Sequence, residues 1–290
     1  MIDEPEQQRR IADGLHARPH DVLGRHRRGR NEWIVAFHPE AAGARFAPAG
    51  PTLEPLDAPG LFCWRGEPGT VRQPYAIEWT LPDGTTFAWT DPWAFVPETY
   101  PEARQAFHEG RHTAAWELLG AHPREREGTA GVRFTVWAPN ARRVSVVGDF
   151  NGWDGRLHPL TRHDGGIWET FVPGTGPGNH YKFEVLDAHG NLRLKADPFA
   201  RYAEARPSTA SIVVPESVYP WSDSEWYGNR PHWTTEPLSF YEVHLGSWLR
   251  HWDNRFYGYR ELGERLARYV SDLGFTHVEL LPITEHPLDA

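Results

Sequence analysis

The feature that most constrains the fold of this chain is an internal repeat. Three short stretches recur later in the sequence in the same order: Val22–His26 as Leu118–His122, Tyr75–Glu78 as Tyr181–Glu184, and Asp91–Ala94 as Asp197–Ala200. The first pair is offset by 96 residues and the other two pairs by 106, so a single insertion or deletion aligns all three. Ordered matches of this kind indicate duplication, which predicts two tandem copies of a module of about 100 residues.

Both copies contain short strand-like runs that are separated by turns. The runs lie at 33–37, 75–79 and 86–89 in the first copy, and at 132–137, 143–148, 167–172 and 180–185 in the second. A helical stretch is expected at about 102–119, between the copies. Strands of this length and spacing predict a mainly β chain with two tandem immunoglobulin-like β-sandwich modules.

The pattern changes after a connector rich in Trp, Pro and Ser at 215–237. An apolar run at 239–244 is followed by a stretch at 259–273 whose apolar residues share one helical face, and then by a second apolar run at 277–283. Strand, helix and buried strand form a βαβ unit with a parallel pair. A (β/α)8 barrel has eight such strands over about 250 residues, so we expect the first βαβ unit of an incomplete barrel.

These patterns divide the chain into four parts. We expect a polar segment at 1–30, a first β-sandwich that is a degenerate copy at 31–115, a second β-sandwich at 116–225, and the start of the barrel at 238–290. The basic run at 25–30 is short and contains a glycine, so we expect it to form a solvated loop.

Composition excludes several classes of function. A net charge of −9 argues against nucleic acid as the main partner, because phosphate binding requires clustered Lys and Arg. The chain has a single cysteine, Cys63, no long apolar run and an acidic N-terminus, so we expect a cytoplasmic protein that does not bind a membrane. The 14 Trp residues fit either β-sandwich cores or flat surfaces that stack on sugar rings.

Three stretches carry a resemblance to a known family. Tyr241–Trp248 and Gly274–Pro287 resemble the first two barrel strands of bacterial glycogen branching enzymes. Val147–Trp153 resembles the signature of the family-48 glycogen-binding module that precedes this barrel. A duplicated N-terminal module is similar to that of the longer bacterial branching enzymes, and the resemblance covers roughly residues 16–290.

The resemblance implies an enzyme that cleaves α-1,4-glucan chains and transfers them to 6-hydroxyls. A retaining mechanism of this kind uses two carboxylates about 5–5.5 Å apart. In the family these lie on the fourth and fifth barrel strands, so we expect no catalytic residue in these 290 residues and no activity from them alone. Two alternatives remain: a non-catalytic glucan-binding or regulatory module, and the N-terminal part of a related debranching or trehalose-forming enzyme.

The same resemblance implies a substrate-binding site for α-glucan in the second sandwich. Trp153 matches the family's stacking tryptophan, and Lys182 matches a lysine that donates to sugar hydroxyls. Leu192 stands near the place where a second stacking tryptophan is expected, and Trp153 packing against the barrel is an alternative. The equivalent stretch of the first copy is Pro48–Pro51, where we predict no site.

Other candidate sites are weaker. His244 ends the first barrel strand, and Glu285 and His286 follow the second, but we assign these residues to support of the pocket or order of the loop. The 16 histidines show no metal-ligand spacing, so we expect no metal and no cofactor. We expect a monomer.

Overall fold

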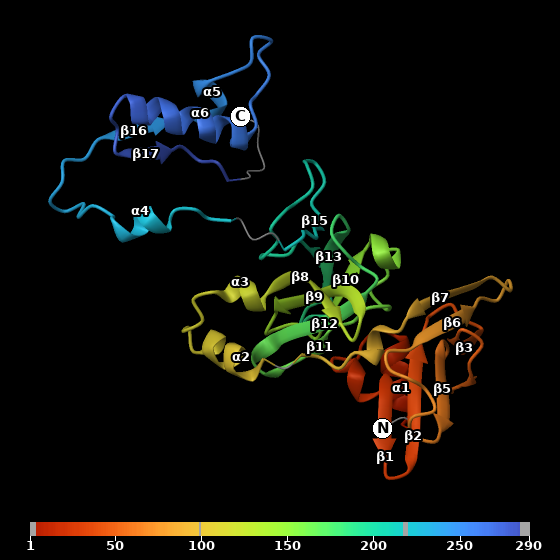
Figure 1. The fold of residues 1–290 in the computed structure, drawn as a ribbon. Helices are drawn as coiled ribbons and strands as arrows, with labels where there is room; N and C mark the ends of the chain where they lie inside the picture. The colour runs from red at the N-terminus through yellow and green to blue at the C-terminus, as the bar shows by residue number, and fades with distance from the viewer. Residues whose placement is uncertain (1–3, 99, 217–219, 285–290) are drawn as a thin grey trace. The chain divides into compact units, whose positions relative to one another are not determined.

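Strands dominate the computed structural model of this chain, which describes residues 4–98, 100–216 and 220–284 (Figure 1). The chain divides into two compact units, Met1–Ser217 and Val218–Ala290. The first unit holds two antiparallel β modules that are joined by short helices, and the second holds a parallel strand pair. The prediction of a mainly β chain with two tandem β modules and a βαβ unit is therefore confirmed.

The first β module comprises the elements from α1 to η2. They are α1 (Pro5–Ala12), η1 (Pro19–Asp21), β1 (Gly24–Arg28), β2 (Asn31–Phe37), β3 (Gly43–Ala47), β4 (Thr52–Pro55), β5 (Leu61–Gly66), β6 (Ala76–Thr80), β7 (Thr86–Thr90) and η2 (Pro92–Ala94). Its strands form one antiparallel sheet in the order β1-β2-β5-β4-β3-β6-β7. β4 pairs with β3 and with β5, so the sheet curls around a core to which β2, β3, β5 and β6 all contribute.

The outer face of the β2–β5 pair is buried as well. Side chains of β2 and β5 on this face, such as Val35 and Leu61, pack against Ile11 of α1 and Leu23. The N-terminal 30 residues therefore contribute apolar side chains to the core as well as polar surface.

The predicted solvated loop at 25–30 is wrong for its first four residues. Arg25–Arg28 belong to β1, whose backbone pairs with Asn31–Ile34 of β2. The Arg25 guanidinium also donates to the carboxylate of Glu32. Charged side chains are compatible with an edge strand, where they face solvent and discourage pairing with other chains.

The second β module follows two short linking helices, α2 (Pro101–His108) and α3 (Ala115–Leu118). It comprises β8 (Gly120–Arg126), β9 (Thr129–Trp137), β10 (Arg143–Gly148), η3 (Asp149–Asn151), β11 (Thr161–Arg162), η4 (Asp164–Gly166), β12 (Ile167–Pro173), β13 (His180–Leu186), β14 (Leu192–Lys195) and β15 (Ser211–Ile212). The sheet β11-β12-β9-β8 packs against a second sheet of β10-β13-β14, in which β15 also pairs with β13. The core between the sheets contains Phe134, Trp168 and Phe183.

The repeated sequences occupy equivalent places in the two modules. Gly24 begins β1 and Gly120 begins β8, and both have positive φ angles, 87° and 106°. A Cβ added at Gly24 would overlap the carbonyl oxygen of Trp93, and one added at Gly120 would lie 3.3 Å from the carbonyl oxygen of Phe199. The positive φ favours glycine at both positions, and at Gly24 the close approach of the backbone also leaves no room for a side chain.

The matched aspartates, Asp91 and Asp197, make the same backbone hydrogen bond in both modules. Asp91 accepts a hydrogen bond from the backbone N of Trp93 at 3.1 Å, and Asp197 accepts one from the backbone N of Phe199 at 2.8 Å. Asp197 also accepts from the hydroxyl of Tyr181 at 2.7 Å. The bond to the backbone N two residues further on therefore recurs in both copies, where it fixes the segment that packs against the first strand of the module.

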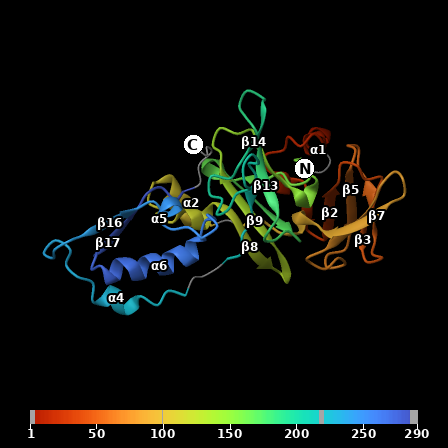
Figure 2. The same ribbon diagram turned by 90° about the horizontal axis from the view of Figure 1, so that it is seen from above.

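The second unit contains the βαβ unit. Its elements are α4 (Ser224–Gly228), β16 (Phe240–Val243), α5 (Leu245–Trp248), α6 (Tyr259–Asp272) and β17 (His277–Leu280). β16 and β17 pair in parallel, from Phe240 opposite His277 to Val243 opposite Leu280. α6 runs alongside this pair in both views and buries Leu266 and Val270 against Val243 (Figure 1 and Figure 2).

Candidate functional site

The predicted stacking residue Trp153 lies in a loop that turns sharply at the end of β10. Gly152 and Trp153 both have left-handed backbone conformations, with φ of 58° and 64°. The backbone N of Trp153 donates to the carbonyl oxygen of Gly148 at 3.1 Å, and the side chain is 39% exposed. A left-handed conformation costs a non-glycine residue roughly 1–2 kcal/mol. Such strain is typical of functional positions, and here it places an indole at the surface.

Asn151 fixes this loop to the sheet. Its Oδ1 accepts from the backbone N of Gly148, and its Nδ2 donates to the carbonyl oxygen of Val146, each at 2.9 Å. The same Nδ2 donates to Nδ1 of His158 at 2.9 Å. Burial lowers the pKa of His158 from 6.5 to about 4, so this ring is neutral and its Nδ1 can accept. The loop that carries Trp153 therefore depends on a neutral histidine.

The predicted partner Lys182 lies on β13, beside the strand from which this loop leaves. Val147 of β10 is opposite Lys182, and Gly148 is opposite Tyr181. The ammonium of Lys182 donates to Oγ1 of Thr209 at 2.8 Å. The structure thus brings the Trp153 loop and Lys182 to the same end of one sheet.

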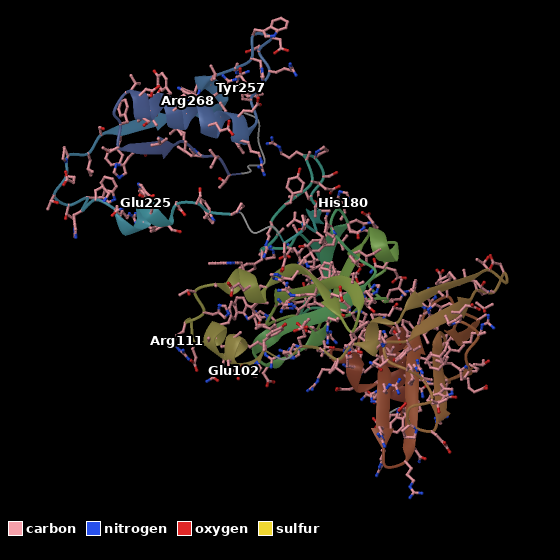
Figure 3. The ribbon with its side chains drawn as sticks, viewed as in Figure 1. Glu102, Arg111, His180, Glu225, Tyr257 and Arg268 are labelled. Carbon is pink, nitrogen blue, oxygen red and sulfur yellow. The ribbon has the colours of Figure 1, made fainter. Side chains whose placement is uncertain are left out.

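Asp149 and His180 belong to this region although we did not select them from the sequence. Asp149 Oδ2 accepts from the backbone N of His180 at 3.1 Å and pairs with its Nδ1 at 2.9 Å; Figure 3 shows His180 on β13. Burial raises the pKa of Asp149, but hydrogen bonds from His180, with a further one from Trp153, outweigh this effect and lower it. Nε2 of His180 lies 3.7 Å from Glu204. Asp149 is part of the sequence signature, whereas only the strand register identifies His180.

The departures from the family pattern are visible in the structure. Leu192 begins β14 and is exposed, so an aliphatic side chain occupies the surface where a second aromatic was expected. Ala76 is the residue of the first β module that corresponds to Lys182. It is opposite Ala47 in the sheet, as Lys182 is opposite Val147 in the second module. The first β module therefore has no lysine at this position.

The other candidates remain separate from this region. His244 lies at the end of β16, where its Nδ1 is 3.2 Å from Oγ of Ser247. Glu285 and His286 lie outside the described residues. Within the described residues, no group of three or more His, Cys, Asp or Glu is placed to hold a metal ion.

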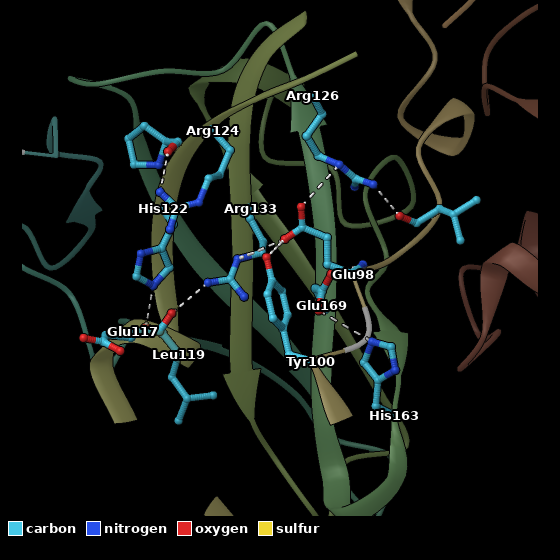
Figure 4. Close-up of polar contacts among 12 residues, drawn as sticks. Glu98, Tyr100, Glu117, Leu119, His122, Arg124, Arg126, Arg133, His163 and Glu169 are labelled. Carbon is cyan, nitrogen blue, oxygen red and sulfur yellow. Dashed lines mark hydrogen bonds and ion pairs between the residues drawn. The ribbon is translucent and has the colours of Figure 1, made fainter. Parts of the chain in front are cut away.

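A partly buried polar cluster lies between the linking segment and sheet β11-β12-β9-β8 (Figure 4). The Glu98 carboxylate lies 3.5 Å from Nε of Arg126 and 4.0 Å from Nε of Arg133. Glu169 accepts from the backbone N of Glu98 at 2.7 Å, and burial raises its pKa to about 7. Burial lowers the pKa of His163, 3.7 Å from Glu169, to about 4. These contacts attach the linker to the sheet, so we assign the cluster a structural role.

Comparison with known proteins identifies the relatives of this chain. Residues 118–200 match the model of Carbohydrate-binding module 48 (Isoamylase N-terminal domain). The chain is 45% identical to the 1,4-alpha-glucan branching enzyme GlgB of Methylococcus capsulatus over 285 residues, which cover 97% of this chain and 38% of that protein. The predicted resemblance is confirmed.

Two further GlgB relatives agree. Identity is 44% to the GlgB of Cellvibrio japonicus, with 97% of this chain and 40% of that protein covered, and 46% to the GlgB of Pseudomonas putida, with 96% and 39% covered. The chain thus spans about two fifths of the length of the GlgB relatives it matches, and it is consistent with their N-terminal portion. The matched module includes Trp153 and Lys182. Among the described residues, no helix is long and apolar enough to cross a membrane.

Proposed function

We propose that this chain is the glucan-binding N-terminal part of a glycogen branching enzyme. Its second β module holds an α-glucan chain, with the indole of Trp153 against a sugar ring and the ammonium of Lys182 close to the hydroxyls. The observation that carries the proposal is the exposed indole, which a strained loop presents at the sheet end where Lys182 lies.

The chemistry of this surface suits a sugar. The C–H face of a glucose ring packs on an aromatic plane, and such contacts add about 1 kcal/mol beyond the area that they bury. The groups near the loop include donors and acceptors, since Lys182 donates to Thr209 and Asp149 pairs with His180 on the same strand. Neutral hydroxyl-rich ligands need both kinds of group.

The branching reaction is proposed for the whole enzyme. The family resemblance assigns its two carboxylates to later barrel strands, and we propose that the βαβ unit is the beginning of that barrel. Val278 and Leu280 of β17 are 39% and 42% exposed, which is unusual for a parallel strand. Further barrel strands and helices would cover them.

The setting of this function is also a proposal. We propose a monomer in the cytoplasm with α-glucan, and not nucleic acid, as its partner. The net charge of −9 and the presence of a single cysteine, Cys63, whose side chain is buried, support this setting.

The test is retardation of the 290-residue chain in gels that contain glycogen. We expect Trp153→Ala to weaken binding about fivefold, which is the effect of losing about 1 kcal/mol. Trp137→Ala is the matched control, because Trp137 lies in the same module and is 49% exposed. Unchanged retardation of Trp153→Ala, or equal losses in both variants, would assign Trp153 to another role.

A further inference from the structure

The first β module contains a hollow that the sequence signature does not predict. It has a volume of about 490 Å³ and lies between η1 and the β1–β2 hairpin, and we call it the hairpin hollow. Its lining residues are His20, Asp21, Val22, His26, Arg27, Arg28 and Trp33. This volume is within the range of about 300–1,000 Å³ that is typical of small-molecule sites.

One wall of the hairpin hollow is aromatic. His26 and Trp33 are opposite one another on β1 and β2, and their rings are stacked with centroids 5.7 Å apart and planes at 18°. Nε2 of His26 donates to the carbonyl oxygen of Val22 at 2.9 Å, which fixes the orientation of its ring. The result is a rigid, partly exposed aromatic surface.

The second β module has no such wall. His122 is the counterpart of His26 in the second copy. The residue opposite His122 in the sheet is Arg133, whereas the residue opposite His26 is Trp33. The side chains of His122 and Arg133 are buried, and Nη2 of Arg133 donates to the carbonyl oxygen of Glu117 in the linker at 2.9 Å. Duplication therefore left an aromatic pair accessible in one module and a covered polar pair in the other.

The remaining walls carry both hydrogen-bond donors and an acceptor. Arg27 and Arg28 are exposed, and neither has an ion-pair partner among the described residues. The Asp21 carboxylate lies 3.5 Å from Nε of Arg18, and both of these side chains are exposed. A carboxylate at the rim disfavours an anionic ligand, whereas a ligand with many hydroxyls can accept from Arg27 and Arg28 and donate to Asp21.

We propose that the hairpin hollow is a second α-glucan site, in which a sugar ring stacks on Trp33 while Arg27, Arg28 and Asp21 bind its hydroxyls. The choice of ligand class rests on the proposed function, but the site uses none of the residues around Trp153. Two sites in the tandem β modules would hold two segments of one branched polymer, and their linkage would raise the overall affinity.

Binding of maltoheptaose to the 290-residue chain, measured by calorimetry in the Trp153→Ala background, tests the proposal. Trp33→Ala should weaken the residual binding about fivefold, but Trp33 is half-buried and its loss could disturb the fold. The exposed double variant Arg27→Ala/Arg28→Ala is therefore the decisive one, and we expect a similar weakening from it. Arg30→Ala is the control, because Arg30 is exposed on the same hairpin but does not line the hollow.

The outcomes separate the two proposals. If the double variant binds maltoheptaose within twofold of its Trp153→Ala parent, or if Arg30→Ala weakens binding equally, the hairpin hollow is not a glucan site. If inorganic phosphate displaces the ligand competitively, the hollow is an anion site and the proposal is wrong. If the hairpin variants weaken binding while Trp153→Ala alone does not, the hairpin site stands and the Trp153 site fails.

Discussion

The neutral state of His158 should make the second β module sensitive to acid. Its pKa is lowered from 6.5 to about 4 by burial. A group with a lowered folded pKa contributes stability that is fully present above pH 6.5 and is lost as the pH falls towards 4, because the unfolded chain then binds the proton more readily. For these two pKa values, acidification from pH 7.5 to pH 5 removes about 2 kcal/mol from the free energy of unfolding.

Other buried groups titrate in the same window, so a single stability curve does not isolate His158. Burial lowers the pKa values of His20 and His163 to about 4, and their contributions have the same sign. Burial raises the pKa of Glu169 to about 7, so its contribution is lost as the pH rises and opposes the histidines between pH 4.5 and 7. A variant that changes only His158 removes these contributions from the comparison.

The suitable variant is His158→Gln, because a glutamine oxygen can accept from Nδ2 of Asn151 without titrating. The free energy of unfolding of the second β module is measured by urea titration at pH 7.5 and pH 5, with the NMR signals of β10 and β13 as probes. We expect the stability advantage of the wild-type chain over the variant to fall by about 2 kcal/mol between the two pH values. A difference that is constant within 0.5 kcal/mol, or an equal change in the exposed-site control His189→Gln, would refute this reasoning.

Two further predictions concern the duplicated contacts. Gly24→Ala should destabilise the first β module by more than about 2 kcal/mol in a urea titration, because its φ is 87° and the added Cβ would overlap a backbone carbonyl oxygen. Gly29 has a φ of 63°, but no atom lies within 4 Å of a Cβ added there, so Gly29→Ala should cost only about 1 kcal/mol. Equal losses of stability in Gly24→Ala and Gly29→Ala would contradict the role of close packing at Gly24. Tyr181→Phe should lower the melting temperature of the second β module, because buried Asp197 loses a hydrogen-bond donor at a cost of about 1–3 kcal/mol. The control Tyr202→Phe changes an exposed tyrosine and should have little effect. Equal shifts in the two variants would exclude the buried hydrogen bond as the cause.

Local sequence patterns were sufficient to place many of the elements. Short apolar or alternating runs between turns predicted β2, β6, β7, β9, β10, β12 and β13, because β-branched and aromatic residues between turn residues favour strands. The repeat predicted the two β modules, and a single apolar helical face predicted α6 between two parallel strands. The signature at Val147–Trp153 also located the loop that carries Trp153.

Tertiary structure decided the features that depend on pairing between distant residues. The sequence of the β1 arginines is typical of a solvated loop, but their backbone pairs with β2 in the fold. The same pairing places Trp33 opposite His26, and both residues line the hollow together with Arg27 and Arg28. The neutrality of His158 follows from burial beside Asn151, which no pattern around residue 158 reveals. The sequence by itself therefore determined many of the strands, the two β modules and which loop resembles a sugar-binding site. Only the fold decided which side chains meet there, because strand register brings together residues that are far apart in the chain.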